Sequence, residues 1–324
     1  MDGGWDYARI QQALARADDS INVKFVYRRL QLIARGLVVM TFIDDALRVI
    51  TDYHGQVTTM RGVRWGKHFG GVYFWSHLIP VLCVLAQASG ATMVLTELRP
   101  QAGCLILIAF SALHPFLYQQ QGNLEFLLES VTIIGGLLIL LSSDRAKARA
   151  RAKLLLAERE EEEQQKDRLL LAGRVCVSAV FVHYVAKMIY ERSSKHDDPL
   201  DAAVDGVLLI LLAVITGLIV VGIKSRWCAA LLALIMALSA LYKHPWFITM
   251  WSKESFKLDF VVGYEGVDVS AWLYSDHQRY FFFQQLSTVG ALMQLAVHGP
   301  GKYSLDEAEA EPFNLETITS KGAE

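Results

Sequence analysis

The chain has 324 residues, a formal net charge of -2 and 53% hydrophobic residues. Its mean hydropathy is +0.30, and its charged residues gather between apolar runs, which is typical of an integral membrane protein. This distribution excludes an ordinary water-soluble globule, and the balanced net charge gives no basis for binding nucleic acid.

Eight apolar segments follow one another along the chain, and we predict an all-α integral membrane protein with about eight transmembrane helices. The segments lie at 30–50, 72–95, 101–119, 124–142, 169–190, 202–223, 227–247 and 280–298. Most of them have the roughly 20 residues that an α-helix needs to cross a bilayer. The first is the weakest, because its clean apolar run covers only Gly36–Ile43 before charged residues begin.

The longest polar interruption, Ser142–Arg168, contains a block of Lys and Arg residues followed by a run of Glu. It has no Pro or Gly and is rich in good helix formers, so we expect a helix. A solvated spacer is the simplest interpretation. A basic block directly after an apolar run is also typical of a segment that faces the anionic cytosolic leaflet of a membrane.

Interpreted in this way, the chain has five parts. We predict a cytosolic N-terminal segment at 1–29, a first four-helix membrane half at 30–142, a charged cytosolic linker helix at 143–168, a second four-helix membrane half at 169–298 and a cytosolic tail at 299–324. Lys and Arg are more frequent on the side of both termini and the linker, which places these parts in the cytosol. The aromatic segment 248–279 then lies on the other side, where we expect it to fold against the helix ends.

The two halves share a sequence pattern. Arg35–Phe42 aligns with Arg174–Phe181, and Glu129–Gly136 aligns with Gln284–Ala291. Because each half has four predicted spans, both halves enter the membrane from the same side, and we expect two parallel four-helix repeats. A chance likeness between apolar helices is the alternative.

The first predicted span carries three charged residues near its end. Asp44 and Arg48 are four residues apart and share one helical face, and Asp45 lies three residues before Arg48, so one cation can serve both carboxylates. Charged side chains at membrane depth normally face a bundle interior or a water-filled cavity. The group is therefore either part of a binding site near the non-cytosolic mouth or a salt bridge that anchors the span.

A second acidic pair, Glu125 and Glu129, lies on one face at the non-cytosolic start of the fourth span. Together with the two aspartates of the first span, it predicts an acidic pocket for a positively charged group such as a free peptide N-terminus. The alternative is that the glutamates pair with Arg48 or Lys187 of other spans.

Other polar residues lie within or beside the apolar segments, and we predict structural roles for Arg35, Arg174, His183, Lys187 and Gln284. Three glycines should permit close packing of helices, namely Gly135, Gly136 and Gly290.

No pattern in the chain indicates catalysis or a bound cofactor. The nine histidines are scattered without HExxH spacing, and the four cysteines lie in apolar runs without CxxC spacing. A Gly-rich phosphate loop and a nucleophile elbow are also lacking. We therefore predict no metal, no cofactor and no enzymatic activity.

Several stretches have an order and spacing that carry a family likeness. They are Ala34–Arg48, Gly135–Leu141 before the charged linker, Gly173-Arg174, Gly222–Leu231, and Phe281–Gly290 running into His298–Glu307. Through them the chain resembles the surfeit locus protein 4 family of eukaryotic cargo receptors of the endoplasmic reticulum.

The resemblance implies a multi-spanning protein with cytosolic termini that binds soluble secretory proteins in the lumen and loads them into coat-protein-II vesicles. Such proteins often bind a short hydrophobic segment near the N-terminus of the cargo, and they cycle between endoplasmic reticulum and Golgi. The expected partners are secretory cargo, cytosolic coat or adaptor proteins, membrane lipids and a second copy of the chain. The chain departs from many members at Thr319–Glu324, where it has no dilysine retrieval signal.

Two other functions fit parts of the sequence. Two parallel halves with polar groups at membrane depth suit the alternating access of a transporter, or a lipid-handling protein such as a scramblase. The four-span halves also resemble the bacterial DoxX-like proteins, and that interpretation requires a quinone or haem.

Overall fold

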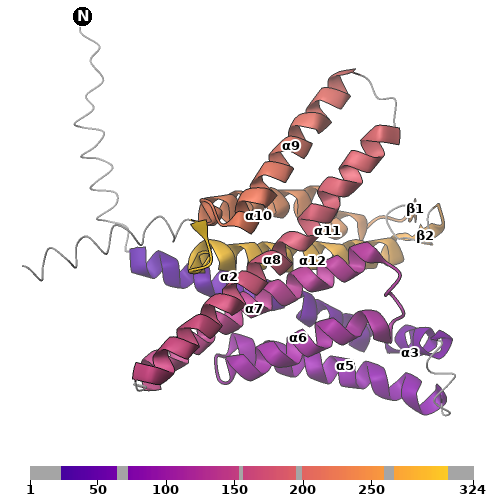
Figure 1. Cartoon of the computed structure of the whole chain (residues 1–324). Helices are drawn as coiled ribbons and strands as arrows, with labels where there is room; N and C mark the ends of the chain where they lie inside the picture. The colour runs from indigo at the N-terminus through magenta and orange to yellow at the C-terminus, as the bar shows by residue number, and fades with distance from the viewer. Residues whose placement is uncertain (1–22, 64–71, 153–155, 195–198, 259–265, 306–324) are drawn as a thin grey trace, which may run out of the picture.

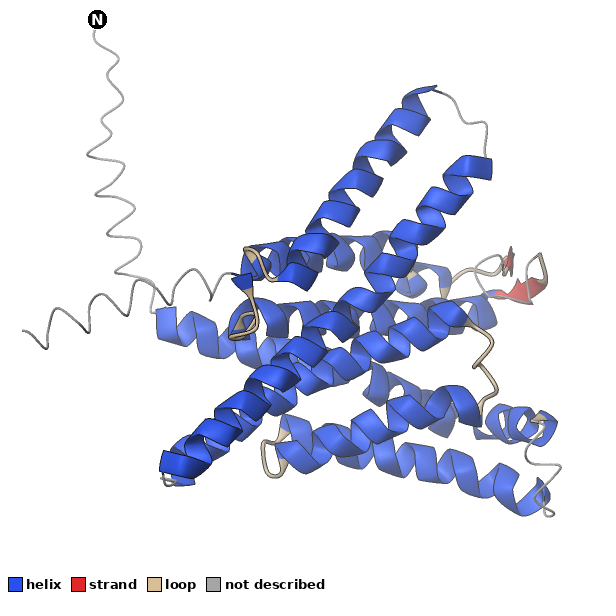
Figure 2. Ribbon diagram, viewed as in Figure 1, coloured by secondary structure: helices blue, strands red, loops and turns tan. Residues whose placement is uncertain are grey.

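The computed structural model describes residues 23–63, 72–152, 156–194, 199–258 and 266–305 (Figure 1). Within these ranges the chain is mostly helical, with α2 (Val23–Thr51), α3 (Tyr53–Gly62), α5 (Val72–Leu95), α6 (Pro100–Leu117), α7 (Leu124–Ala152), α8 (Leu156–Ser194), α9 (Pro199–Val221), α10 (Ser225–Lys243), α11 (Trp246–Thr249) and α12 (Ala271–His298). Two three-residue strands, β1 (Ser255–Lys257) and β2 (Asp268–Ser270), form a small antiparallel pair (Figure 2).

Some of these helices are long and apolar enough to cross a membrane. Among the residues that the structure describes, five stretches qualify, which are Tyr73–Leu95, Pro100–Leu117, Leu124–Asp144, Gln164–Tyr190 and Ser225–Thr249. A shorter apolar stretch, Gly206–Val221, lies in α9. The protein is therefore a mostly helical integral membrane protein, as its composition predicts. The helices α2 and α12 are less apolar, because α2 carries charged residues and α12 carries several glutamines.

Several boundaries differ from those predicted. The helix α2 begins at Val23 rather than at 30, and α12 begins at Ala271 rather than at 280. Ser270 caps α12 by accepting a hydrogen bond from the backbone N–H of Leu273 at 3.4 Å. The charged linker is divided between the end of α7 and the start of α8, and residues 153–155 lie outside the described part. So do most of the predicted N-terminal segment and tail.

The bundle is organised around α7 and α12, which pack against each other (Figure 1). Each also packs against the first helix of the other half, so that α7 contacts α8 and α12 contacts α2. One apolar core gathers around Phe42 and Leu137, and another around Phe181 and Leu292. The helix α3 and the strand pair lie at one end of the bundle, and the start of α2 lies at the other (Figure 1).

Aligned positions in the two halves make the same hydrogen bonds. The hydroxyl of Thr132 in α7 donates to the carbonyl of Cys176 in α8 at 3.4 Å. The hydroxyl of Ser287 in α12 donates to the carbonyl of Leu37 in α2 at 3.0 Å. In the alignment of the two halves, Thr132 corresponds to Ser287 and Cys176 corresponds to Leu37. The same side chain–backbone bond therefore joins both helix pairs.

The predicted packing glycines lie at the closest approaches of these helices. A Cβ atom added to Gly135 would lie 2.7 Å from the backbone nitrogen of Val177, and one added to Gly290 would lie 2.5 Å from that of Val38. Both distances are too short for a real side chain. Only glycine therefore lets the backbones pack as they do, in the way that small residues act in membrane helices. Gly136 likewise leaves no room beside α12, since its added Cβ would lie 2.6 Å from the Cβ of Ala291.

Replacing Gly290 with Ala should lower the free energy of unfolding by about 1–3 kcal/mol, because the new methyl group meets backbone rather than a movable side chain. Thermal unfolding of the purified protein in detergent measures this change. Gly217→Ala in α9 is the matched control, since a Cβ atom there meets nothing within 4 Å. It should leave stability unchanged or slightly raised. Equal melting temperatures for the two variants would contradict the close packing of α2 and α12.

Candidate functional site

A cavity of about 350 Å³ lies at the end of the bundle that carries α3. The helices α2, α3, α6, α7 and α12 line it, together with the turn between α6 and α7. Its lining residues are Asp45, Arg48, Gln56, Thr59, His114, Tyr118, Gln120, Asn123, Glu125, Phe126, Glu129, His277, Tyr280 and Phe281. Three carboxylates and one guanidinium therefore face a single space with aromatic walls.

Four of the five residues predicted for a binding site line this cavity. Asp45 and Arg48 reach it from α2, and Glu125 and Glu129 reach it from α7. The fifth, Asp44, precedes Asp45 by one residue and so projects about 100° away around the helix. Its carboxylate forms an ion pair with α12 instead. The structure thus separates the two adjacent aspartates.

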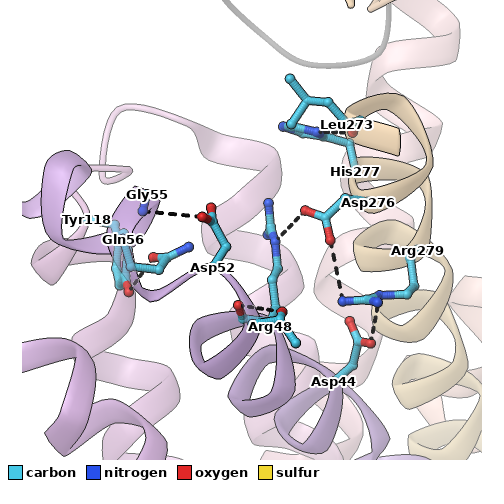
Figure 3. Close-up of polar contacts among 11 residues, drawn as sticks. Asp44, Arg48, Asp52, Gly55, Gln56, Tyr118, Leu273, Asp276, His277 and Arg279 are labelled. Carbon is cyan, nitrogen blue, oxygen red and sulfur yellow. Dashed lines mark hydrogen bonds and ion pairs between the residues drawn. The ribbon is translucent and has the colours of Figure 1, made fainter. Parts of the chain in front are cut away.

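Asp44 belongs to a chain of four alternating charges that joins α2 to α12 (Figure 3). Arg48 pairs with Asp276 at 2.8 Å. Arg279 lies 3.4 Å from Asp276 and 3.1 Å from Asp44. The direct ion-pair partner of Arg48 is therefore Asp276 of α12, while Asp44 and Asp45 of its own helix lie close enough to interact with it electrostatically. None of the four side chains is more than 28% exposed, so solvent screens these pairs only in part.

Two carboxylates of the cavity receive hydrogen bonds from neutral donors. The side-chain amide of Gln87 in α5 donates to Asp45 at 2.5 Å. The hydroxyl of Tyr184 in α8 donates to one oxygen of Glu129 at 3.4 Å, and the amide of Gln284 in α12 donates to the other at 2.5 Å. Amides and phenols satisfy the oxygen lone pairs of both groups. Asp45 and Glu129 thus present to the cavity two acidic groups whose described hydrogen-bond donors are neutral.

Glu125 differs, because Lys187 of α8 pairs with it at 3.2 Å. This is the pairing that the alternative interpretation of the acidic pair expected. The side chain of Glu125 is 36% exposed and that of Lys187 is 47% exposed. An ion pair this open to solvent adds only about 0–1 kcal/mol to stability. A ligand that brings its own positive charge can therefore displace Lys187 at little cost.

The cavity continues inward into a smaller chamber of about 40 Å³. The two spaces share Asp45, His114, Phe126 and Tyr280. Beyond these shared residues the lining is mixed, with the apolar side chains of Phe42, Phe110 and Ile133 beside Thr41, Ser111, Ser130 and Gln284. A ligand can therefore place a charged group beside these shared residues and a small group in the inner chamber.

Arg35 lies on α2 toward the other end of the bundle and is only 3% exposed. Its guanidinium forms ion pairs with Asp144 of α7 and, at 3.4 Å, with Glu97 after α5. It also donates a hydrogen bond to the carbonyl of Val94 at 3.1 Å. These contacts join the α5–α6 turn to α2 and α7.

Arg174, the aligned residue of α8, is 2% exposed. Its guanidinium donates to the carbonyl of Pro300 at 3.3 Å and to that of Tyr303 at 2.8 Å. It therefore holds the segment that follows α12. His183 is half-buried beside Tyr184 on the same helix.

The described cysteines are free thiols, and within the described residues no three His, Cys, Asp or Glu side chains are grouped to hold a metal ion.

Several residues of the site were not predicted from the sequence. Asp276 and Arg279 were missed because the last span was expected to begin at 280. The helix-capping residue Ser270 was the available signal for an earlier start. His114 and Tyr280 carry no local signal, because only the packing of distant helices turns them toward one cavity.

The structure thus defines a polytopic helical membrane protein with a charged, aromatic-walled cavity at one end of its bundle. A family model described as the SURF4 family matches residues 9–265. The match covers more than half of the chain, and the protein belongs to this family.

Relatives from three organisms match most of the chain. The Surfeit locus protein 4 homolog of Schizosaccharomyces pombe is 28% identical over 85% of this chain and 80% of its own length. The Drosophila melanogaster homolog is 25% identical over 86% of this chain and 89% of its own length. The Saccharomyces cerevisiae ER-derived vesicles protein ERV29 is 21% identical over 85% of this chain and 75% of its own length. No solved structure matches the chain.

Replacing Arg35 with Gln should lower the free energy of unfolding by about 3–5 kcal/mol, because the buried carboxylate of Asp144 then loses this cation. Adding Asp144→Asn to the same chain removes the stranded charge and should recover much of the loss. Thermal unfolding of both single variants and the double variant in detergent measures the coupling between the two residues. Strictly additive losses would show that the pair contributes nothing as a pair.

Proposed function

We propose that this protein is a cargo receptor of the endoplasmic reticulum membrane, which binds soluble secretory proteins in the lumen and loads them into coat-protein-II vesicles for transport to the Golgi. Membership of the SURF4 family supports this, as does a relative named as a protein of ER-derived vesicles. The observation that carries the proposal is the cavity, because it gathers three acidic side chains and several aromatic rings at one end of the bundle. A receptor of this kind needs a binding site but no catalytic group.

We infer that the eight longest described helices cross the membrane as two parallel repeats. The first comprises α2, α5, α6 and α7, and the second comprises α8, α9, α10 and α12. The matching contacts at aligned positions, from Thr132 and Ser287 to the two packing glycines, support this arrangement. Both termini and the junction of α7 with α8 then lie in the cytosol, and the cavity opens toward the lumen.

The ligand chemistry follows from the charges. Asp45 and Glu129 place two acidic groups at the cavity wall, and the hydrogen-bond donors described for them are neutral. A free amino terminus is a cation that suits these acidic groups, and each cargo chain has only one. The rings of Tyr118, Phe126 and Phe281 then offer apolar surface to the first side chains of that segment. The carboxylates thus select a terminus and the rings select its apolar character.

The cytosolic surfaces would serve the vesicle coat. The N-terminal segment 1–29 and the charged stretch 143–168 are the parts that the proposed topology exposes there, and coat or adaptor proteins are their expected partners. In this scheme the vesicle cycle moves the cargo, so the receptor requires no cofactor. The protein would cycle between endoplasmic reticulum and Golgi, surrounded by membrane lipids and free to associate with a second copy.

Asp45→Asn and Glu129→Gln should each weaken the capture of a soluble secretory protein by about tenfold or more, because each removes a charge that faces the ligand amine. Crosslinking in the lumen of microsomes, followed by affinity purification of the receptor, measures the captured cargo. Asp268→Asn is the matched control, since this exposed carboxylate lies on β2 at the same end of the bundle. It should leave capture unchanged.

Two outcomes would redirect the proposal. Equal capture by all variants would make the carboxylates structural and move the site elsewhere, with the aromatic segment 248–279 as the next region to test. No capture by the unaltered protein would exclude the receptor function. The purified protein would then be tested in liposomes for flux of lipid or solute, which the transporter interpretation predicts.

The proposed topology can be tested with engineered glycosylation sites, because only lumenal Asn-x-Ser/Thr acceptors are modified. Lys253→Asn creates an acceptor in the segment before β1, and Glu316→Thr creates one in the tail. We expect glycan addition to the first variant and none to the second, read as a gel shift that an endoglycosidase reverses. The opposite result would invert the orientation.

A further inference from the structure

The third helix of each half ends near a His-Pro pair, His114-Pro115 in α6 and His244-Pro245 after α10. Extending the alignment of α7 with α12 pairs Phe126 with Phe281. Each histidine packs against one of these rings, at 5.6 Å between His114 and Phe126 and at 5.7 Å between His244 and Phe281. The two histidines therefore occupy equivalent places in the bundle.

The protein itself satisfies His244. Its Nδ1 atom lies 3.0 Å from the side-chain oxygen of Gln278, and its Nε2 atom lies 3.3 Å from the side-chain amide of Gln285. In the other half the aligned residues are Asn123 and Ser130, which have shorter side chains. Both of these bond to the backbone of their own helix, at its N–H and its carbonyl respectively. Neither reaches across to the equivalent histidine.

His114 is instead packed among rings and turned to the cavity. The rings of Phe110, Tyr118 and Phe126 lie 5.1, 4.7 and 5.6 Å from its imidazole. Within the described chain no hydrogen bond to its side chain is seen, and it lines both the cavity and the inner chamber. Where the second half has two glutamine side chains, the first half has open space.

We propose that His114 is a ligand contact that determines specificity, and that the ligand takes the place of the two missing glutamines. The neutral imidazole accepts a hydrogen bond from the terminal amine or the first amide N–H of a bound peptide, while Asp45 and Glu129 balance the charge of the amine. This assignment rests on the proposed function of the same cavity. It adds a polar contact where the two spaces meet, so that the ligand passes His114 on its way from the carboxylates to the inner chamber.

The contact makes binding dependent on pH. A protonated imidazole has no acceptor and repels an ammonium group, so acidification should release an amine-bearing ligand. The other charged or titratable groups that face this space come from three helices and from the end of a fourth. They are Asp45 and Arg48 of α2, Tyr118 directly after α6, Glu125 and Glu129 of α7, and His277 and Tyr280 of α12. Because several such groups face the same space, variants must separate the effect of His114 from theirs.

The test measures the affinity of the purified, full-length protein for a short synthetic peptide with a free amino terminus and aliphatic first residues. We expect the affinity to fall by about threefold to tenfold between about pH 7.4 and about pH 5.0, a window that includes the acidic side of the histidine titration range. His114→Gln keeps an acceptor but cannot titrate in this range, so it should bind at the higher pH and lose the pH dependence. His277→Gln is the matched control, since its Nδ1 is already bonded to the carbonyl of Leu273 at 2.8 Å. It should keep the pH dependence of the unaltered protein.

A variant that closes the site tests the comparison between the halves directly. Ser130→Gln supplies one of the glutamines that satisfy the other histidine, so it should occupy His114 and weaken peptide binding at both pH values. The N-acetylated peptide should bind weakly to every form, because it lacks the charged amine.

The outcomes separate this inference from the proposed function. If His114→Gln retains the full pH dependence, or if Ser130→Gln binds as well as the unaltered protein, the assignment of His114 is wrong while the receptor function stands. If Asp45→Asn and Glu129→Gln bind the peptide normally at the higher pH, the cavity is not the amine site, and the proposed function loses its main support.

Discussion

The packing of α2 against α12 is the contact on which the cavity depends. The two backbones approach so closely that Gly290 has no room for a side chain beside Val38. Nearer the cavity, the ion pair of Arg48 with Asp276 joins the same helices. The helix α2 is the first described helix and α12 is the last, so this contact joins elements that are far apart in sequence. Without it, the acidic side chains of α2 and the aromatic side chains of α12 would not face one space.

Charge at membrane depth imposes the second constraint, because an ionised side chain in the bundle needs a partner. The structure uses two kinds of partner. Arg35 with Asp144 and Arg48 with Asp276 cancel each other's charge and join helices. Glu129 instead accepts hydrogen bonds from the neutral side chains of Tyr184 and Gln284. The first kind of contact joins helices by charge, and the second holds an acidic group at the cavity wall.

Local patterns in the sequence were enough to predict the helices but not the partners of the charged side chains. Hydrophobicity and helix length are properties of neighbouring residues, and the packing glycines could be aligned between halves before any contact was known. The partner of Asp44 could not be predicted, because Arg279 lies on a helix that the sequence placed too late. The cavity brought together Asp45 and Glu129, as the spacing of acidic pairs suggested. The aromatic walls of the cavity could not be predicted, because their side chains come from helices that only the fold brings together.

The aligned parts of the chain place His114 and His244 in equivalent positions, and the side chains around these two histidines differ. In the second half, Gln278 and Gln285 reach the imidazole of His244, so the space is filled by the chain itself. In the first half, the shorter side chains of Asn123 and Ser130 leave the space open. Under the proposed function, only the open position is available to a ligand. Two longer side chains are enough to fill the other position, and they do so without altering the packing of α7 against α12.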